Sequence, residues 1–315
     1  MTEAGRPALV AVDWGTSSLR VWLLDGHGAV LGEARSNEGM QKAREIGFAP
    51  VLDRVLTELS APAGLATIVC GMAGARQGWI EAPYAEVPCT LDHIFDGAIA
   101  VPYPGRDVKI VPGLAQTSSS SPDVMRGEET QIAGAVGNLG SGRHVVCMPG
   151  THSKWVEIEN GRVTGFTSWM TGEVFNLFAV HSILSHSIGD AATGIKADDP
   201  AFAEGLARGL DEPDRVTSLT FGIRAATLLH GLPPGAAAAR LSGILIGAEI
   251  ASARKRYLAE SKEVILVASG RLGDVYAFAV GKAGLSARLV DADEAVRAGL
   301  LHAARVNGMV PEVSA

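Results

Sequence analysis

Short apolar runs separated by polar turns open the chain. Residues 8–13 are apolar up to their last position and predict a buried strand. Residues 19–25 alternate between two faces with a period of two, which predicts a second strand. Residues 29–35 predict a third strand after a Gly-His-Gly turn. The chain is therefore expected to begin with a meander of three strands.

Strand and helix patterns then alternate along the rest of the chain, which indicates an α/β protein. Segment 115–123 (AQTSSSSPD) predicts a polar loop, and 139–143 (LGSGR) is the best candidate for a linker. Apolar positions at helical spacing predict helices over residues 48–60, 128–138, 172–187, 203–210, 218–230, 236–259, from Asp274 onward, and 293–306. Further strands are predicted over residues 65–71, 107–112, 263–268 and 287–290.

The turn between the first two predicted strands occurs twice. VDWGTSSLRVWLLDG (12–26) can be placed over CMPGTHSKWVEIENG (147–161) at an offset of 135, and both copies predict strand, turn, strand. With two residues dropped, the match continues beyond the second strand. The matched pairs are Gly15 with Gly150, Thr16 with Thr151, Ser18 with Ser153, Val21 with Val156, Gly26 with Gly161, Val30 with Val163, and Gly32 with Gly165. The sequence therefore predicts a duplication.

Turns of glycine and hydroxyl residues expose backbone N–H groups that suit phosphate oxygens. A Walker loop or a dinucleotide-binding fingerprint needs a helix after the glycines, and a strand follows here, so both are excluded. One such turn alone is most simply an ordinary hairpin turn, but two in register favour a phosphate site. The predicted phosphate-binding residues are Gly15, Thr16, Ser17, Ser18, Gly150, Thr151, His152, Ser153 and Lys154.

Three acidic residues are candidates for chemistry. Asp13 ends an apolar strand, where it could form the turn or hold a hydrated Mg²⁺. The second copy has Met148 at this position, so only one hairpin carries the acid. Glu128 and Glu129 begin a predicted helix, where they could stabilise its first turn or act as a general base for a substrate hydroxyl.

Loops that follow predicted strands supply the other candidates, because ligands of α/β proteins bind there. Arg76 could bind a carboxylate, with Gln77 and Trp79 beside it, and Arg20 and Lys154 directly follow the two hairpin turns. Each of these cations could equally be an ordinary surface charge. The stretch 264–281 predicts strand, Gly-rich turn and helix, and its turn residues could pack against a nucleotide base and sugar. These turn residues are Ser269, Gly270 and Arg271.

Composition narrows the class of protein. The 315 residues are 47% hydrophobic and 19% charged, enough for two cores, and the net charge of −7 argues against a general nucleic-acid binder. Three separated cysteines predict reduced core residues of a cytosolic protein. Residues 1–8 are not typical of a signal peptide, and we find no apolar run of 18 or more residues. A cytoplasmic protein without membrane or nucleic-acid partners is expected, and a homodimer is compatible with the sequence.

Together these motifs resemble the superfamily of sugar kinases, heat-shock ATPases, actin and acetate kinase. DWGTSS is similar to its first phosphate motif, PGTHSK to its second, and VASGRLG to its adenosine motif. The chain resembles one family more closely, 2-keto-3-deoxygalactonokinase, over residues 10 to 273. The stretches that carry this resemblance are VDWGTSSLR, GMAGARQGWIEAPY, PDVMRGEETQ, CMPGTHSKW and SWMTGEVF.

The resemblance implies two duplicated ribonuclease-H-like domains, the actin-like ATPase fold, with an ATP cleft between them. The first domain is expected over residues 1–140 with the sugar-acid pocket, and the second over 141–315 with the adenosine motif. The terminal helix is expected to pack back on the first domain.

The implied reaction is ATP-dependent phosphorylation of the 6-hydroxyl of 2-dehydro-3-deoxy-D-galactonate in galactonate breakdown, with Mg²⁺. Glu129, then Glu128, is the expected base by similarity to exopolyphosphatases, and Asp13 the metal ligand. Arg76 is the first candidate for the substrate carboxylate, ahead of Arg20 and Lys154. Met148 departs from superfamily members that carry an acid in the second hairpin.

Three alternatives stay open at this point. The substrate could be the gluco epimer or another sugar acid. An exopolyphosphatase-like phosphohydrolase would share the hairpins and the Glu-Glu pair, but it would need a long cationic groove, and the acidic net charge of the chain argues mildly against one. A non-enzymatic protein of the actin type would not need a polar sugar pocket.

Overall fold

The computed structural model describes residues 5–137, 139, 141–258 and 262–311. Parts of the predicted linker 139–143 and of the predicted helix 236–259 lie outside the described residues. Contacts divide the chain into two units, and we describe each by itself. The first unit contains Met1–Gly142, Glu159–Gly165 and Ala292–Ala315, and the second contains Arg143–Ile158 and Phe166–Asp291. As domain limits, 1–140 and 141–315 stay a prediction.

The first unit is built on a mixed sheet in the order β3-β2-β1-β4-β8-β7. β1 pairs antiparallel with β2 and β2 with β3, so the predicted meander is confirmed, whereas β4 and β8 run parallel to β1. These strands are β1 (Pro7–Trp14), β2 (Leu19–Asp25), β3 (Val30–Ser36), β4 (Thr67–Gly71), β7 (Ile99–Val101) and β8 (Val108–Ile110).

A small sheet in the order β10-β9-β5 adds three strands to this unit, whereas the short β6 pairs antiparallel with β13 (Arg162–Trp169). The segment predicted as a polar loop, 115–123, is partly wrong, because Ala115 and Gln116 pair with residues of β10. The short strands are β5 (Tyr84–Glu86), β6 (Cys89–Thr90), β9 (Gly113–Gln116) and β10 (Asp123–Met125). The helices are α1 (Met40–Ile46), α2 (Phe48–Glu58), α3 (Leu91–Asp96), α4 (Glu128–Val136) and α11 (Ala292–Val306).

The second unit repeats the strand order of the first. Its strands follow the order β15-β14-β11-β12-β13, which corresponds to β8-β4-β1-β2-β3. β14 runs parallel to both β11 and β15, as β4 does to β1 and β8. The predicted duplication and the ribonuclease-H-like α/β fold are thereby confirmed. These strands are β11 (Arg143–Met148), β12 (Ser153–Glu159), β13 (Arg162–Trp169), β14 (Glu263–Val267) and β15 (Ser286–Val290).

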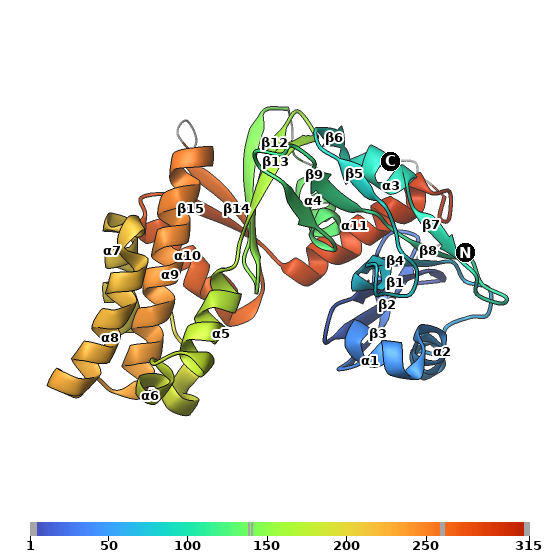
Figure 1. Ribbon diagram of the computed structural model, residues 1–315. Helices are drawn as coiled ribbons and strands as arrows, with labels where there is room; N and C mark the ends of the chain where they lie inside the picture. Colours follow the sequence, from blue (N-terminus) through green and yellow to red (C-terminus); the bar gives the residue numbers. More distant parts are fainter. Residues whose placement is uncertain (1–4, 138, 140, 259–261, 312–315) are drawn as a thin grey trace. The chain divides into compact units, whose positions relative to one another are not determined.

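Six α-helices of the second unit are described, and α7 and α8 both pack on the long α9 (Figure 1). One continuous helix over 172–187 was expected and is wrong, because the backbone becomes extended at Ser182, where α5 ends, and α6 begins only at Ser185. α10 begins four residues before the expected Asp274. The helices are α5 (Thr171–His181), α6 (Ser185–Ile188), α7 (Pro200–Asp211), α8 (Val216–His230), α9 (Pro234–Tyr257) and α10 (Gly270–Lys282).

α9 is the helix to which the expectation on apolar runs applies most closely, although Arg240 and Glu249 interrupt it. By length and composition it could cross a membrane, since its most apolar 18-residue window has a mean hydropathy of 1.3. However, 72% of that window is buried inside the protein, and the core helix of a soluble protein has the same composition. The window is therefore weak evidence for a membrane span.

Close helix packing places the terminal helix on α4. A Cβ atom on Gly299 of α11 would lie 1.9 Å from the carbonyl oxygen of Thr130, and one on Gly134 would lie 1.9 Å from that of Ala295. Only glycine allows the two backbones to approach this closely. α11 therefore fixes the start of α4, which carries Glu128 and Glu129.

Candidate functional site

The first Gly-Thr-Ser-Ser turn, residues 15–18, joins β1 to β2 with its three hydroxyl side chains exposed. The start of helix α1 forms hydrogen bonds with the backbone of this turn. The N–H groups of Met40 and Gln41 donate to the carbonyls of Gly15 at 2.9 Å and Thr16 at 3.1 Å. The start of a helix, whose N–H groups lack partners within the helix, thus satisfies the carbonyls of the turn.

The second turn, residues 149–152, has the same support from α5. The N–H group of Glu173 donates to the carbonyl of Thr151 at 3.0 Å. Thr151 and His152 are exposed, and the His152 ring contacts the Glu173 carboxylate. The second turn therefore resembles the first in how its backbone is held.

Each helix start approaches its turn so closely that it requires glycine. A Cβ atom on Gly39 would lie 2.5 Å from backbone atoms of Ser17 and Ser18. A Cβ atom on Gly172 would lie 2.6 Å from the Gly150 carbonyl oxygen. The two glycines are 133 residues apart, the offset of the later part of the repeat. The duplication thus extends beyond the strands to the support of the turns.

The direction of the turn amides follows from peptide geometry. In a trans peptide the N–H group points opposite to the C=O group of the same plane. The carbonyls of Gly15 and Thr16 point toward α1, so the N–H groups of Thr16 and Ser17 point away from it. By the same argument the bound Thr151 carbonyl directs the N–H group of His152 away from α5. Amides directed in this way suit an anion.

Ser153 and Lys154, also predicted to bind phosphate, have buried side chains. The Ser153 hydroxyl lies 3.0 Å from the Tyr276 hydroxyl, and the Lys154 ammonium donates to the His152 carbonyl at 3.1 Å. In this structure both side chains support the second turn from within the unit. As phosphate ligands they stay a prediction.

Asp13, the penultimate residue of β1, belongs to a chain of alternating charges. Its carboxylate accepts from Arg20 at 2.5 Å, and Arg20 also contacts Asp293 of α11, which in turn binds Arg35. Burial raises the pKa of Asp13, an effect that Arg20 opposes. Asp13 and Asp293 raise the pKa of Arg20 against the opposite effect of burial. Arg20 is thus already held by two acids.

A magnesium site would therefore depend on Asp13 and the nucleotide. No group of three or more His, Cys, Asp or Glu residues able to hold a metal occurs within the part of the chain that the structure describes. Mg²⁺ commonly takes one or two carboxylates together with phosphate oxygens and water. A single carboxylate beside a phosphate turn fits this chemistry.

Glu129 is completely buried at the start of α4. Its carboxylate accepts from the N–H group of Gly127 at 2.6 Å and from the Thr130 hydroxyl at 2.9 Å. Burial first, and then the neighbouring charge of Glu128, raise the pKa of Glu129 to about 7. Glu128 is half-buried, and its carboxylate accepts from the N–H group of Arg126 at 3.1 Å. A pKa of about 7 suits Glu129 to act as a base at neutral pH.

The loop after β4 carries the three predicted substrate contacts Arg76, Gln77 and Trp79, which differ in their exposure to solvent. Arg76 and Gln77 are exposed, whereas Trp79 is half-buried and packs among aromatic rings. Its ring stacks on Phe48 at 5.7 Å and meets Trp14 edge-on at 5.9 Å. Trp79 therefore fastens this loop to the core, and its role as a substrate contact stays a prediction.

Arg126 is a candidate that the sequence analysis missed. Its guanidinium lies 4.3 Å from the centre of the Tyr84 ring, and Nη2 donates to the Ala82 carbonyl at 2.8 Å. Nε and Nη1 are buried without a hydrogen-bond partner among the described residues. Its place directly before Gly127, in the stretch MRGEETQ, was the available signal.

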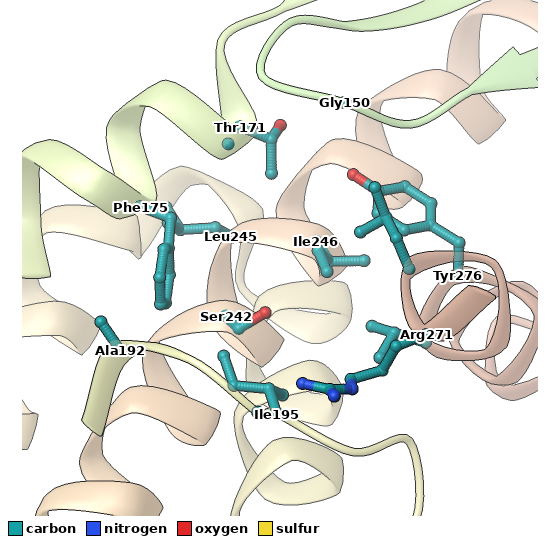
Figure 2. A pocket seen from close by; sticks show the side chains of 14 residues that line it. Gly150, Thr171, Phe175, Ala192, Ile195, Ser242, Leu245, Ile246, Arg271 and Tyr276 are labelled. Atoms are coloured by element: carbon teal, nitrogen blue, oxygen red, sulfur yellow. The ribbon is translucent and has the colours of Figure 1, made fainter. Parts of the chain in front are cut away.

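The second unit contains a cavity of about 310 Å³ between α5, α9 and α10. Its lining is mainly apolar, with Thr171, Ser242, Arg271 and Tyr276 as polar exceptions (Figure 2). The Arg271 side chain extends toward Ile195 on the opposite wall. Gly150 of the second turn also lines the cavity, whereas Ser269 and Gly270 are exposed residues outside the lining. The size and lining are typical of a small-molecule site.

Comparisons with known proteins agree along almost the whole chain. A family model described as 2-keto-3-deoxy-galactonokinase matches residues 13–303. The chain is 53% identical over 308 residues to a Rhizobium meliloti (strain 1021) protein named probable 2-dehydro-3-deoxygalactonokinase DgoK1, covering 97% of this chain and 98% of the relative. It is 36% identical over 295 residues to the 2-dehydro-3-deoxygalactonokinase of Escherichia coli (strain K12), covering 92% and 95%.

A solved structure is similar as well. The crystal structure of a Sinorhizobium meliloti protein assigned as a 2-dehydro-3-deoxygalactonokinase superposes with a TM-score of 0.91 at 52% identity. The match covers 95% of this chain and 99% of that one.

Proposed function

Because this chain belongs to the 2-keto-3-deoxy-galactonokinase family, we propose that it is a sugar-acid kinase of galactonate catabolism. It transfers the γ-phosphoryl group of ATP to the 6-hydroxyl of 2-dehydro-3-deoxy-D-galactonate. The products are ADP and 2-dehydro-3-deoxy-6-phospho-D-galactonate. The substrate is a small molecule, and the reaction is expected in the cytoplasm.

The observation that carries this proposal is the pair of turns with outward-pointing amides. Their backbone N–H groups and the exposed hydroxyls of Thr16, Ser17, Ser18 and Thr151 can donate to phosphate oxygens. Phosphoryl transfer depends mainly on positioning and on stabilising charge, which fixed backbone donors provide without reorganisation. The cavity beside the second turn is proposed to take the adenosine, with Arg271 on its wall.

Asp13 would hold the magnesium ion through water. When bound, Mg²⁺ neutralises charge on the phosphate oxygens. Arg20, which contacts Asp13 in this structure, keeps Asp293 as a second partner if Asp13 turns toward the metal. Arg20 therefore neutralises Asp13 when no metal is bound. If Mg²⁺ takes over that role, the Arg20 guanidinium still has Asp293 as an ion-pair partner.

Glu129 is proposed as the base. It accepts the proton of the 6-hydroxyl while the oxygen of that hydroxyl attacks the γ-phosphorus. A carboxyl group with a pKa of about 7 is partly ionised at neutral pH and binds the proton readily once it arrives. Glu128 is the alternative, because its carboxylate is half-buried while that of Glu129 is closed off from solvent.

The carboxylate of the sugar acid needs a cation. Arg76 is exposed and stays the first candidate, with Gln77 and Trp79 beside it. Arg20 and Lys154 are less suitable, since the first is held by two acids and the second is buried. Arg126 is added as a second candidate, because two of its nitrogen atoms have no hydrogen-bond partner among the described residues.

An assay that couples ADP formation to a panel of 2-keto-3-deoxy sugar acids and simple aldonates tests the function. The galacto compound is expected to give a kcat/KM about tenfold or more above that of the gluco epimer. Faster turnover of the gluco epimer would reassign the substrate. Phosphate release from polyphosphate without any sugar acid would replace the kinase by a phosphohydrolase.

A further inference from the structure

A buried carboxyl group in the second unit has no place in the mechanism above. Glu249 lies in the middle of α9 and is only 2% exposed. Burial raises its pKa, an effect that hydrogen bonds from Thr171, Trp155 and Tyr276 oppose. A carboxyl group in an apolar interior is costly unless its oxygens are well bonded, so its presence on a core helix needs a reason.

The carboxyl group of Glu249 joins three other elements. Oε1 accepts from the Trp155 ring N–H group of β12 at 2.8 Å. Oε2 accepts from the Tyr276 hydroxyl of α10 at 2.9 Å and from the Thr171 hydroxyl at the start of α5. Because Tyr276 has one proton and donates it to Glu249, the Ser153 hydroxyl, 3.0 Å away, donates to Tyr276.

Three of these residues, Ser153, Thr171 and Tyr276, border the proposed nucleotide site. Ser153 matches Ser18 in the repeat and begins β12 directly after the second turn. Thr171 of α5 and Tyr276 of α10 both line the 310 Å³ cavity (Figure 2). Thr171 also precedes Gly172, whose backbone approaches the turn. The turn and two walls of the cavity therefore meet at one carboxyl group.

We propose that Glu249 is a positioning residue for the nucleotide, holding the second phosphate turn and the walls of the adjacent cavity in one fixed arrangement. The ligand class is a nucleoside triphosphate, and this rests on the proposed function for the identity of the phosphate site. The first turn is supported differently, by backbone hydrogen bonds from α1 and by the charges around Asp13.

Glu249→Gln tests the role without removing the side chain. The amide keeps the size but replaces one acceptor oxygen by an N–H donor, so at least one of the three donors loses its partner. We expect the Kd for ATP, measured by calorimetry without sugar acid, to rise about tenfold, and the KM for ATP with it. The KM for the sugar acid is expected to change less than twofold. Tyr276→Phe is expected to act in the same direction.

A matched control separates positioning from loss of stability. Ile223→Ala removes a buried side chain of α8 in the same unit, in the core cluster around α8 and α9, and lowers thermal stability without touching the hydrogen bonds of Glu249. It is expected to leave the Kd for ATP unchanged at temperatures where it is folded. In a double-mutant cycle, Glu249→Gln and Tyr276→Phe should be non-additive, because they remove one network.

An unchanged Kd in Glu249→Gln would overturn the proposal, as would an equal rise in the Kd of Ile223→Ala at matched stability. Binding of ATP by the unmodified protein without phosphorylation of any sugar acid would contradict the proposed function alone. In that case the effect of Glu249→Gln on ATP affinity still decides the present proposal. Failure of the unmodified protein to bind ATP would overturn both.

Discussion

The two turns of this protein share a backbone arrangement but differ in the chemistry behind it. Each turn lies between two strands, and the start of a helix holds its carbonyls through a close glycine. Behind the first turn lies an ionic chain of Asp13, Arg20 and Asp293. Behind the second, Met148 replaces the acid, and Glu249 is bonded only to neutral donors.

This difference indicates that the two duplicated units can take different roles in binding and catalysis. The backbone of the turn is what both copies retain, because amides that point outward bind phosphate whatever the side chains are. The acids proposed to act on metal and substrate lie in the first unit, where burial and then the charges of Asp13 and Glu129 raise the pKa of the Cys70 thiol. The second unit supplies a cavity and an internal framework. Substitutions at matched positions should therefore have unequal effects.

The largest effect is expected for the candidate base. Glu129→Gln should lower kcat about 10²- to 10⁴-fold, because the amide cannot accept the proton of the attacking hydroxyl. Glu128→Gln, the matched neighbour, should cost much less. Single-turnover rates of both variants decide between the two glutamates, and the reverse order of effects would assign the role to Glu128.

The pH dependence of kcat/KM and of stability tests the role of Glu129 independently. kcat/KM should fall as the pH is lowered through about 7, because the proton then occupies the carboxylate of Glu129. Between 4.5 and 7 the folded chain binds this proton more tightly than the unfolded chain, so stability should decrease as the pH rises. Glu129→Gln should remove that decrease in denaturant titrations. A pH profile of stability that is identical in the variant would contradict the assignment.

The next largest effect is expected at Asp13, the acid that precedes the first turn and that Met148 replaces before the second. Asp13→Asn should lower kcat/KM about 10²-fold and weaken the dependence on Mg²⁺, since the charge that holds the metal is lost. Met148→Leu at the matched position preserves an apolar side chain and should change kcat/KM by less than about threefold. Mg²⁺ titrations of both variants measure this, with melting curves as a check on folding. Equal losses in the two variants would remove the distinction between the turns.

Substitution of the glycines behind the turns should instead affect both copies alike. Gly39→Ala and Gly172→Ala each place a methyl group within 2.6 Å of backbone atoms in the turn, which must then move. A loss of about 1–3 kcal/mol in unfolding free energy and a severalfold rise in the KM for ATP are expected from each. Gly222→Ala, whose Cβ would meet nothing within 4 Å, is the control. An effect confined to one turn would mean that the two are not equivalent phosphate ligands.

The smallest effect is expected at the surface of the second turn. His152 is exposed and its ring contacts Glu173, and exposed ion pairs contribute about 0–1 kcal/mol. His152→Ala should therefore raise the KM for ATP by at most about fivefold, the equivalent of that free energy. A loss of kcat as large as that of Asp13→Asn would mean that His152, and not its backbone amide, is the group that matters.

Local signals in the sequence predicted the strands and the repeat, because alternation and matched glycines are properties of adjacent residues. Contacts over long sequence separations could not be predicted in this way. Arg20 is bound by Asp293, 273 residues later, so the sequence suggested a free cation where the structure has an ion pair. Ser153 matched Ser18 in the alignment, yet it is buried against Tyr276. Arg126 lay inside a motif that was recognised for its glutamates.

The most direct test of the proposed kinase activity is the stoichiometry of its two products. Phosphorus NMR of the unmodified protein with ATP, Mg²⁺ and 2-dehydro-3-deoxy-D-galactonate should show ADP and a phosphate ester on the C6 oxygen forming in equal amounts. Without the sugar acid, ADP formation should be slower by orders of magnitude, on the order of 10³-fold. Release of inorganic phosphate at the same rate with and without the sugar acid would contradict the account.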